Sequence, residues 1–379
     1  MKNIQVLQNK KIAIVVEELT QLGGAERELD CILEIFPDSP IYTLVWDAEK
    51  TLHRYDNQDI RTSVIQKLPL GKKKYKWYLA LMPWAVEKFD LSDFDIIISI
   101  TSALVKGIKT TNKQLHICYC NTPTRYLWVD SQEYLKNAPI PFYIRPLMPL
   151  VIKYLKKWDL KASRRPDFII ANSKNVAQRI NRYYHRKADT IIYPTADTVK
   201  FKPASKKDFY LLVSRIEPYK KIDLVIEAFR GLNEKLIIVG SGSKLAAMRL
   251  TAPKNIKFVG RLSDEKLSEL YAQAKAFIFP QEEDFGLTPI ESMAAGTPVI
   301  AYKKGGVLET VVAGVTGEFF YPQEAEALEK VIVNFNPRKY QRQRLQKQAQ
   351  KFDNSVFKRE FLEYTIDKIS QKLKQEDRN

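Results

Sequence analysis

Two carboxylates, Glu283 and Glu291, stand eight positions apart within residues 281–301. The apolar run before them, residues 274–280, predicts a buried parallel strand. Both acids therefore follow the C-terminal end of a strand, where open α/β sheets place their ligands. A structural role is the alternative: Glu291 could be a first-turn acid favoured by the helix dipole, and Glu283 one of three consecutive acids on a solvated loop.

The residues around the two acids favour ligand binding over packing. Gly286 permits a close approach of the backbone, and Pro289 suits the first turn of a helix. The small residues 292–296 let that helix pack tightly on the sheet, and residues 297–301 start another strand. We therefore expect both carboxylates at a ligand site.

Two basic residues, Arg215 and Lys220, lie just past another predicted strand and ahead of a helix. Two cations at this place could neutralise a diphosphate, although most such isolated pairs are merely solvated. Residues 239–245 add a second strand-to-helix turn with Gly240 and Gly242. This glycine pair lacks the third glycine of a dinucleotide fingerprint, but together the features predict a nucleotide site.

The N-terminal part contains a similar turn. Residues 11–19 predict a strand, Gly23 and Gly24 a turn, and residues 25–36 a helix. Helix N-terminal amides and a close backbone approach favour phosphate or carboxylate groups. On its own this turn is weak evidence for an anion site.

We expect no metal site. Asp93 and Asp95 have the D-x-D spacing of many cation-binding sugar-transfer enzymes, but they precede a strand, at the end opposite to ligand sites. Cys31 stands alone, and Cys118 and Cys120 are too close on one strand to bridge well. No second Cys or His pair completes a ligand set.

Composition limits the class of protein. The chain has 379 residues, 45% of them hydrophobic, which suggests two domains. Its early apolar run is too short for a signal peptide, and no run could span a bilayer, so we expect a cytoplasmic protein. The net charge of +17 suggests an anionic partner, but no nucleic-acid motif is found.

The basic residues gather in three segments. Residues 67–89 and 143–167 combine lysines with aromatic and aliphatic residues, a pattern typical of an anionic membrane surface and equally of ordinary solvated helices. Residues 336–351 contain no acid and predict a solvated helix. Peripheral binding at the inner face of a membrane is therefore one expectation.

The order of elements predicts two α/β halves. Further strands are expected at 40–46, 95–100, 115–120 and 167–173, interleaved with helices. Residues 188–208, with two prolines, predict a linker, and a second α/β series follows it. Two such halves predict a ligand cleft between them.

This combination resembles the GT-B glycosyltransferases, and among them glycosyltransferase family 4 (group 1). The likeness extends over nearly the whole chain. Its most specific element is the Glu-x7-Glu pattern of Glu283 and Glu291. The others are Arg215 followed five residues later by Lys220, and the Gly-Gly loop in residues 22–27.

The resemblance gives these residues roles. It implies that Arg215 and Lys220 bind the donor diphosphate, that Glu283 contacts the donor sugar and that Glu291 holds the ribose. A second glycine loop of the family is matched by Gly305 and Gly306. Other donor-binding positions implied are Gly23, Gly24, Gly240, Gly242, Arg261, Leu262, Phe285, Gly286, Leu287 and Thr288.

The implied reaction is metal-independent sugar transfer with retention of anomeric configuration, from a GDP- or UDP-linked hexose. The analogy favours mannose-type transfer to a lipid-linked or polysaccharide acceptor. A sugar-nucleotide epimerase or a phosphorylase of the same fold should lack the group 1 pattern. A catalytically silent nucleotide-sugar-binding or membrane-associated protein is the non-enzyme alternative.

One position departs from the family pattern. Relatives usually carry His where this chain has Asn121, which hydrogen-bonds but carries no proton at neutral pH. Asn121 could still position a sugar hydroxyl, or activity or specificity could differ. His116 is interpreted as structural. Arg125, Tyr126 and Trp128 keep the motif and are expected to contact the acceptor.

The fold implied is GT-B, two Rossmann-like doubly wound domains facing across a cleft. The family commonly returns its last helix to the first domain, and residues 355–375 have the helical apolar periodicity to do so. The expected domains are therefore 1–194 plus 355–379, which is discontinuous and binds the acceptor, and 195–354, which binds the nucleotide sugar.

Overall fold

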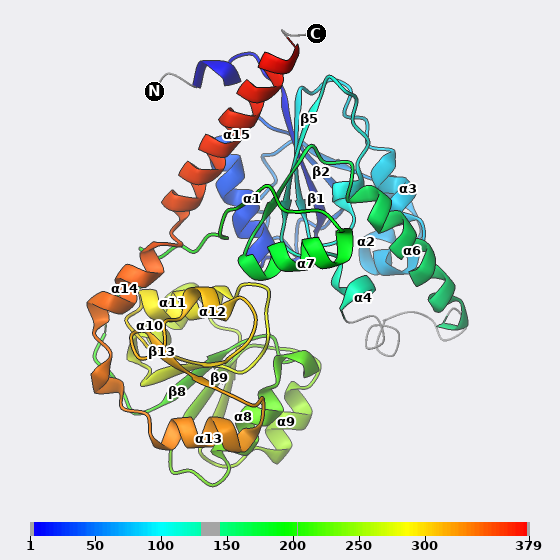
Figure 1. Ribbon diagram of the computed structural model, residues 1–379. Helices are drawn as coiled ribbons and strands as arrows, with labels where there is room; N and C mark the ends of the chain where they lie inside the picture. The colour runs from blue at the N-terminus through cyan, green and yellow to red at the C-terminus, as the bar shows by residue number, and fades with distance from the viewer. Residues whose placement is uncertain (1–3, 130–144, 203, 377–379) are drawn as a thin grey trace. The chain divides into compact units, whose positions relative to one another are not determined.

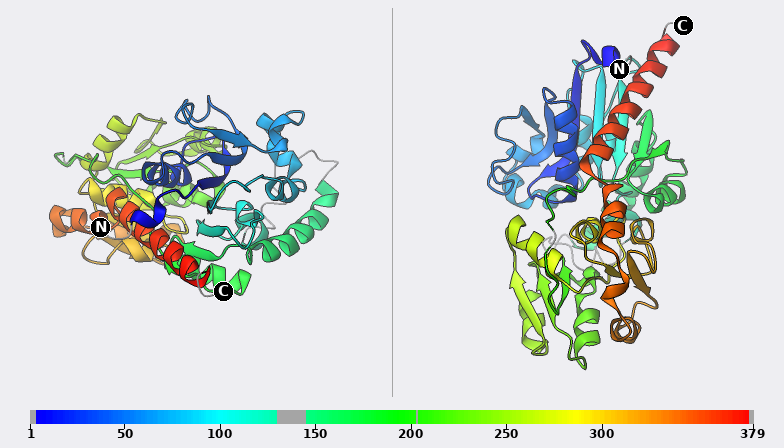
Figure 2. Two further views of the ribbon diagram at one scale, coloured as in Figure 1. Left: turned by 90° about the horizontal axis from the view of Figure 1, so that it is seen from above. Right: turned by 90° about the vertical axis from the view of Figure 1, so that its left-hand side faces the viewer.

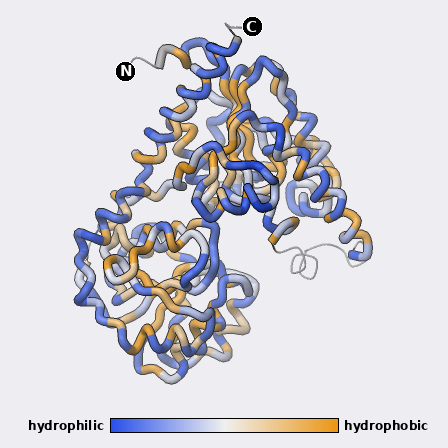
Figure 3. The backbone as a smooth tube through the Cα atoms, viewed as in Figure 1, coloured by the Kyte–Doolittle hydropathy of each residue, from blue (hydrophilic) through white to orange (hydrophobic). Residues whose placement is uncertain are grey.

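The computed structural model describes residues 4–129, 145–202 and 204–376 (Figure 1). The chain divides into two compact units. The first contains Met1–Tyr193 and Phe357–Asn379, and the second contains Pro194–Val356. Each unit is built around its own parallel sheet, whose strands are predominantly hydrophobic (Figure 3).

The sheet of the first unit has seven parallel strands among the described residues, in the order β3-β2-β1-β4-β5-β6-β7. The chain therefore reverses its direction of progress across the sheet between β1 and β4, which makes this point the topological switch point. The strands are β1 (Ile12–Leu19), β2 (Ile41–Trp46), β3 (Ile60–Thr62), β4 (Ile96–Thr101), β5 (Leu115–Cys120), β6 (Phe168–Ala171) and β7 (Thr190–Ile191).

Helices cover both faces of this sheet. On one face, α1 (Gly24–Ile35) and α15 (Asn354–Glu376) pack against the strands, where Phe357 and Phe361 are buried. Figure 2 shows α15 running along the same side of the unit as α1. The other face is covered by α3 (Met82–Glu87), α6 (Met148–Ala162) and α7 (Lys174–Tyr184).

Short helices complete the first unit, one before β1 and the others in the connections between its strands. They are η1 (Ile4–Leu7), η2 (Val64–Lys67), α2 (Gly71–Lys74), η3 (Tyr75–Tyr78), η4 (Val105–Gly107), α4 (Arg125–Trp128) and η5 (Arg145–Leu147).

The sheet of the second unit has six parallel strands among the described residues, in the order β10-β9-β8-β11-β12-β13. Its switch point lies between β8 and β11, which pair directly. The strands are β8 (Tyr210–Val213), β9 (Leu236–Val239), β10 (Ile256–Gly260), β11 (Ala276–Phe279), β12 (Val299–Tyr302) and β13 (Gly317–Phe320).

Two layers of helices enclose this second sheet. One layer contains α8 (Ile222–Phe229) and α13 (Ala325–Val333), whose apolar residues join the main core. In the other, α11 (Leu287–Ala294) packs on α10 (Asp264–Gln273), α12 (Val307–Thr310) and α14 (Arg342–Gln350). The remaining helices are α9 (Leu245–Thr251), η6 (Pro218–Lys220) and η7 (Pro337–Lys339).

The prediction of two Rossmann-like doubly wound α/β domains is confirmed. The strands predicted from apolar runs all form, and residues 355–375 lie within α15. The short strands β3, β7 and β13 were not predicted, and β7 lies inside the expected linker 188–208. The basic run 336–351 is partly helical, but Leu345 and Ala349 are buried, so α14 is more than a solvated helix.

Several smaller expectations concern single residues. Asp95 precedes β4 and accepts from the backbone N–H of Lys11, so it lies at the end of the sheet opposite to the switch-point loops. All three cysteines are buried and free. Among the described residues, no helix is long and apolar enough to cross a membrane. Of the segment 143–167, residues 143 and 144 lie outside the described residues.

Candidate functional site

The residues with the strongest chemical pattern meet at the switch point of the second sheet. Arg215 and Lys220 follow β8, and Glu283 follows β11, the neighbouring strand. The C-terminal ends of adjacent parallel strands open onto the same edge of a sheet, and side chains from their loops converge there. Lys220 and Glu283 are 63 positions apart in the sequence, and the fold brings their side chains into contact.

The ammonium of Lys220 forms an ion pair with Oε1 of Glu283. The side chains are 12% and 24% exposed, so the pair is mostly screened from water yet still accessible. Gln281 Nε2 donates to the same carboxylate oxygen at 3.0 Å. Gln281 itself is buried, and its Oε1 has no partner among the described residues. Arg215 is exposed at the rim.

Glu291 differs from Glu283 in its surroundings. It lies in the second turn of α11, is 3% exposed, and its Oε2 accepts a hydrogen bond from Tyr271 at 2.9 Å. A buried carboxylate needs such donors because burial without them is costly. Glu291 therefore belongs to the interior of the site, and the predicted contact with a ribose stays a prediction.

The glycines of the site let backbone segments approach each other closely. Gly305 has φ +80°, and a Cβ there would come within 2.5 Å of the carbonyl oxygen of Glu283. The next residue, Gly306, donates its N–H to that same carbonyl at 2.9 Å. The loop before α12 thus fixes the backbone from which the Glu283 side chain projects.

The second glycine turn supports Arg215 in the same way. Gly240 has φ +142°, and a Cβ there would lie 1.9 Å from the carbonyl oxygen of Ser214. A Cβ on Gly242 would lie 2.3 Å from the carbonyl oxygen of Ile216. Only glycine therefore lets the β9 turn pack against the β8 loop.

The N-terminus of α11 points its free amides out of the same loop. Gly286, with φ +90°, precedes the helix, and Leu287 and Thr288 form its first turn. The first N–H groups of a helix have no intrahelical partner and suit anionic ligands. Phe285 is buried against Phe352 with ring centroids 5.4 Å apart, which anchors the loop.

The end of β10 lies beside the end of β9, because Gly240 donates its N–H to the carbonyl of Gly260 at 2.8 Å. Arg261 follows directly and is exposed, and Leu262 is partly exposed. The second unit thus brings all its predicted donor-binding residues to one end of one sheet. The remaining predicted residues belong to the first unit.

In the first unit, Gly23 and Gly24 form the turn between β1 and α1. The backbone N–H of Gly23 donates to Oε2 of Glu26 at 2.7 Å, so a helix acid caps this turn. The amide of Gly23 is therefore engaged within the protein.

Asn121 follows β5, and both ends of its amide are engaged. Its Nδ2 donates to Oε2 of Glu28 on α1 at 2.6 Å, and its Oδ1 accepts from Asn172 at 3.2 Å. Asn172 in turn accepts from Ser173, which caps α7 because its Oγ accepts from the N–H of Val176. The amide thus links α1 to the β6–α7 turn.

Glu28 is 3% exposed. Burial raises the pKa of this carboxyl to about 8, with a further contribution from Glu26, against the lowering effect of the hydrogen bond from Asn121. The Glu28 carboxyl can therefore gain or lose a proton near neutral pH, whereas the amide of Asn121 cannot. His116 is fully buried against Ser99, and burial lowers its pKa to about 3, which confirms the structural interpretation.

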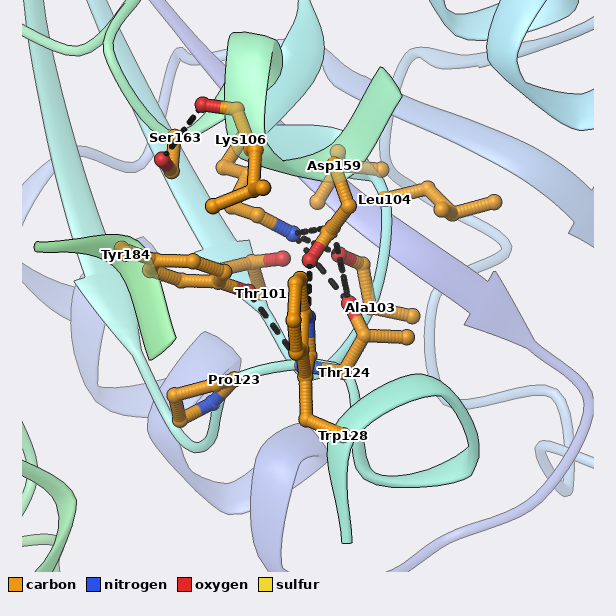
Figure 4. A network of polar contacts seen from close by, with 12 residues as sticks. Thr101, Ala103, Leu104, Lys106, Pro123, Thr124, Trp128, Asp159, Ser163 and Tyr184 are labelled. Carbon is orange, nitrogen blue, oxygen red and sulfur yellow. Dashed lines mark hydrogen bonds and ion pairs between the residues drawn. The ribbon is translucent and has the colours of Figure 1, made fainter. Parts of the chain in front are cut away.

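The predicted acceptor residues lie on α4. Trp128 donates its indole N–H to Asp159 at 2.7 Å and stacks on Tyr183. Figure 4 shows this indole within a buried network in which Lys106 pairs with Asp159. Trp128 therefore has a structural partner, while Tyr126 borders a pocket. An acceptor contact by Arg125, Tyr126 or Trp128 stays a prediction.

Some site residues were not predicted. Gln281 and Tyr271 contact the two carboxylates, and Glu28 contacts Asn121, yet none belongs to a recognisable motif. Gln281 could have been suspected, because it follows a buried strand directly. The described residues contain no group of three acidic, His or Cys side chains suited to a metal, which leaves the expected metal independence a prediction.

Comparison with known proteins finds similarity over the part of the chain that contains this site. Residues 195–352 match the model of the glycosyl transferases group 1, and this match covers less than half of the chain. A D-inositol 3-phosphate glycosyltransferase of Streptomyces scabiei is 28% identical over 207 residues, covering 45% of this chain and 46% of that protein. The chain spans no more than about half the length of the curated relatives it matches.

Solved structures resemble the chain over most of its length. A sucrose-phosphate synthase from Thermosynechococcus elongatus has a TM-score of 0.74 at 17% identity, covering 96% of this chain and 100% of that one. HepE of Anabaena in complex with UDP-glucose has a TM-score of 0.67 at 20% identity, covering 94% and 99%. At such identities the likeness shows the fold, which is GT-B.

Proposed function

We propose that this chain is a glycosyltransferase that moves a hexose from a nucleoside-diphosphate sugar to an acceptor. The observation that carries the proposal is the contact between Lys220 and Glu283 at the switch point of the second sheet. One cation and one anion stand there beside the free amides of α11. A sugar diphosphate presents both an anionic leaving group and an anomeric carbon that becomes positive, so this pair fits it.

The chemistry follows from where charge develops. The bond from the anomeric carbon to the diphosphate breaks, the acceptor oxygen forms the new bond, and its proton passes to the diphosphate oxygen that leaves. Lys220, Arg215 and the N-terminus of α11 stabilise the departing diphosphate. Glu283 orients the sugar hydroxyls and stabilises the positive anomeric carbon. Gln281 and Lys220 hold its carboxylate in place.

The finer assignment follows the family resemblance. Retention of anomeric configuration, a GDP- or UDP-linked donor, no metal requirement and a mannose-type sugar remain the first hypotheses. HepE binds UDP-glucose, so a UDP-sugar belongs in the first test beside a GDP-sugar. Glu283 and Glu291 contact different parts of one donor in this proposal, so they are not the acid and base of a glycosidase.

The acceptor is proposed to be lipid-linked or a polysaccharide. Two segments on the same core of the first unit favour a lipid surface. The segment 67–89 exposes Leu81 and Trp84, at 48% and 49%, beside exposed lysines, and α6 exposes Leu150 at 67%. Exposed apolar side chains among basic residues suit a membrane with anionic lipids, where the chain would bind peripherally.

The donor half of the proposal is tested by thermal stabilisation with UDP, GDP, UDP-glucose and GDP-mannose. A ligand that binds only the folded state raises the melting temperature, and the rise grows with the logarithm of the ligand concentration relative to its Kd. We expect one nucleotide series to stabilise the chain, and Lys220→Met to remove most of that shift. Arg230→Ala is the control, because Arg230 is exposed at the end of α8 and pairs only locally with Glu227.

A measurement of turnover distinguishes a transferase from a catalytically silent nucleotide-sugar-binding protein. Asn121 in place of the usual His favours a silent nucleotide-sugar-binding protein as the second candidate. Release of free nucleotide from the stabilising donor, with or without acceptor, supports the transferase. Strong stabilisation without any turnover across the donor panel supports the silent protein. Equal stabilisation of the wild type and Lys220→Met contradicts the proposed donor site in both cases.

A further inference from the structure

A pocket of about 290 Å³ lies in the first unit at the switch point of its sheet. The end of β1, the loop after β4, the start of α1 and the segment from η3 to α3 enclose it. Its lining includes Glu17 and Glu18 of β1, Leu104 after β4, and Tyr126 of α4. Ligands of doubly wound sheets bind at this position.

The walls are mainly apolar, and the charged groups among them are mostly acidic. Five leucines and one methionine belong to the described lining, together with three carboxyl groups and a single ammonium. The carboxylates are Glu17, Glu18 and Glu26, and the ammonium is that of Lys76. A phosphate or carboxylate placed here would have three carboxyl groups and only one ammonium, that of Lys76, as charged or titratable neighbours in the described lining. This pocket is therefore unsuited to the diphosphate of the donor.

Two of the three acids already serve the fold. Oε1 of Glu17 accepts from the hydroxyl of Thr101 and from the backbone N–H groups of Ala103, Leu104 and Val105, at 2.7–3.2 Å. Glu26 caps the turn before α1 by accepting from Gly23. Glu17 cannot leave its donors without stranding backbone N–H groups of buried residues, because Leu104 and Val105 are buried.

Glu18 keeps capacity for a ligand. Within the described part of the chain, its carboxylate has one hydrogen-bond donor, the hydroxyl of Tyr75, at 2.9 Å from Oε1. Burial, and next the charge of Glu17, raise the pKa of this carboxyl to about 7. A carboxyl in this state can accept from, or donate to, a hydroxyl group.

We infer that this pocket is the acceptor subsite of the proposed transferase and that it takes an uncharged sugar residue, hydrogen-bonded by Glu18 and packed on the apolar wall. The inference rests on the proposed function, because a transferase needs a second substrate site besides the donor groups of the second unit. A sugar ring has both an apolar C–H face and hydroxyl edges. The volume is close to the lower limit of about 300–1,000 Å³ for small-molecule sites, which suits a single ring.

The inference excludes a class of acceptors. Sugar phosphates and uronic acids would place a negative charge beside Glu18 and Glu17. The basic surface of the protein does not alter this, because only Lys76 brings a positive charge to the described lining. An anionic carrier can be attached to the acceptor only outside the pocket.

The test measures binding of sugars to the intact chain without donor, by saturation-transfer NMR. The probes are methyl glycosides of glucose, mannose, galactose and N-acetylglucosamine, each beside its 6-phosphate. We expect at least one neutral glycoside to bind and its 6-phosphate to bind at least tenfold more weakly. Ser102→Trp, which fills the pocket from its lining, should abolish binding, and Val64→Trp, outside the lining, should leave it unchanged.

Glu18→Leu and Glu18→Gln separate the role of the carboxyl. We expect Glu18→Leu to weaken binding of the neutral glycoside at least tenfold. Glu18→Gln should still bind the neutral glycoside, and the difference in affinity between it and the 6-phosphate should be smaller than in the wild type. Stabilisation by nucleotide should persist in every variant, which shows that each one folds and keeps the donor site. Two outcomes overturn the inference and leave the proposed donor site intact. In the first, sugar phosphates bind as tightly as the neutral glycosides. In the second, no glycoside binds although nucleotide still stabilises the chain.

Discussion

At the scale of single residues, Asn121 is the position where the chain departs from the pattern of the family that it resembles. Both ends of its amide are engaged, with Glu28 on one side and Asn172 on the other. The partner Glu28, rather than Asn121, holds a group that titrates near neutral pH. Asn121 therefore links α1 to the β6–α7 turn, and the group of this pair that can change protonation is the Glu28 carboxyl.

The raised pKa of Glu28 predicts how stability depends on pH. The folded-state value of about 8 exceeds the ordinary value of 4.5, so the folded chain binds more protons between these limits. Stability from this group is fully present below about pH 4.5 and is lost as the pH rises towards 8. Glu28→Gln should remove this loss, because the Gln Oε1 can still accept from Asn121.

Melting temperatures of the wild type and Glu28→Gln between pH 5 and 8.5 measure this effect. The difference should move in favour of the variant as the pH rises. Glu34→Gln is the matched control, because Glu34 lies on the same helix with its side chain 58% exposed in a pair with Lys358. Parallel pH profiles for the wild type and Glu28→Gln would show that Glu28 does not titrate as described.

Glu283 is predicted to act on the rate more than on donor binding. Glu283→Gln keeps the size of the side chain but removes the charge that, in the proposed function, faces the anomeric carbon. Loss of one group that stabilises developing charge lowers kcat by roughly 100- to 1,000-fold. Steady-state kinetics should show this fall while nucleotide affinity changes little.

The neighbouring acid provides the control for Glu283. Glu282 pairs with Lys304 at 3.0 Å, and Glu282→Gln should keep near wild-type turnover. A collapse of donor affinity with unchanged kcat at saturation in Glu283→Gln would contradict the assignment.

At the scale of elements, the glycine turns decide how accurately the site is held. Gly305 has a left-handed backbone and leaves no room for a Cβ beside the Glu283 carbonyl. A non-glycine residue with this backbone costs about 1–2 kcal/mol before any clash is added. The loop before α12 therefore supports the loop of Glu283 through its backbone.

Gly305→Ala is predicted to destabilise the chain by at least about 1–2 kcal/mol and to lower turnover, because the Glu283 backbone must shift. Urea unfolding gives the stability change, and transfer kinetics give the effect on the site. Gly231→Ala is the control, since a Cβ at Gly231 meets nothing within 4 Å. An unchanged free energy of unfolding in Gly305→Ala would show that the loop yields freely.

Elements of strong periodicity were predictable from the sequence, and short or long-range features were not. The apolar runs that became β4 and β11 are buried on both faces, which is why they were recognisable. The two-residue strand β7 carries too little pattern. Lys220 and Glu283 were predicted at one ligand site because each follows a predicted strand of the second α/β series. The pocket around Glu18 was not, because segments distant in sequence form it.

At the scale of the whole molecule, the net charge of +17 exceeds what the donor site needs. Part of the excess lies at residues 71–74, beside the exposed side chains of Leu70, Leu81 and Trp84. Lysines and exposed apolar groups together provide the two kinds of attraction that hold a peripheral protein at an anionic membrane. Lys72 also pairs with Asp47 at 3.3 Å, and the ammonium of Lys74 lies over the ring of Trp77, while Leu70, Leu81 and Trp84 are 48–52% exposed.

Binding to vesicles tests this interpretation of the charge. We predict that the chain co-sediments with vesicles containing anionic lipid, more weakly with neutral ones, and less as salt rises. Each lysine near the surface contributes about 1 kcal/mol, so Lys73→Gln with Lys74→Gln should weaken partition by at least about tenfold. The control is Lys254→Gln with Lys257→Gln, an equal change of charge at two exposed lysines of the second unit. Equal losses in both double variants would mean that net charge alone drives binding, and indifference to lipid charge would remove the segment's proposed role.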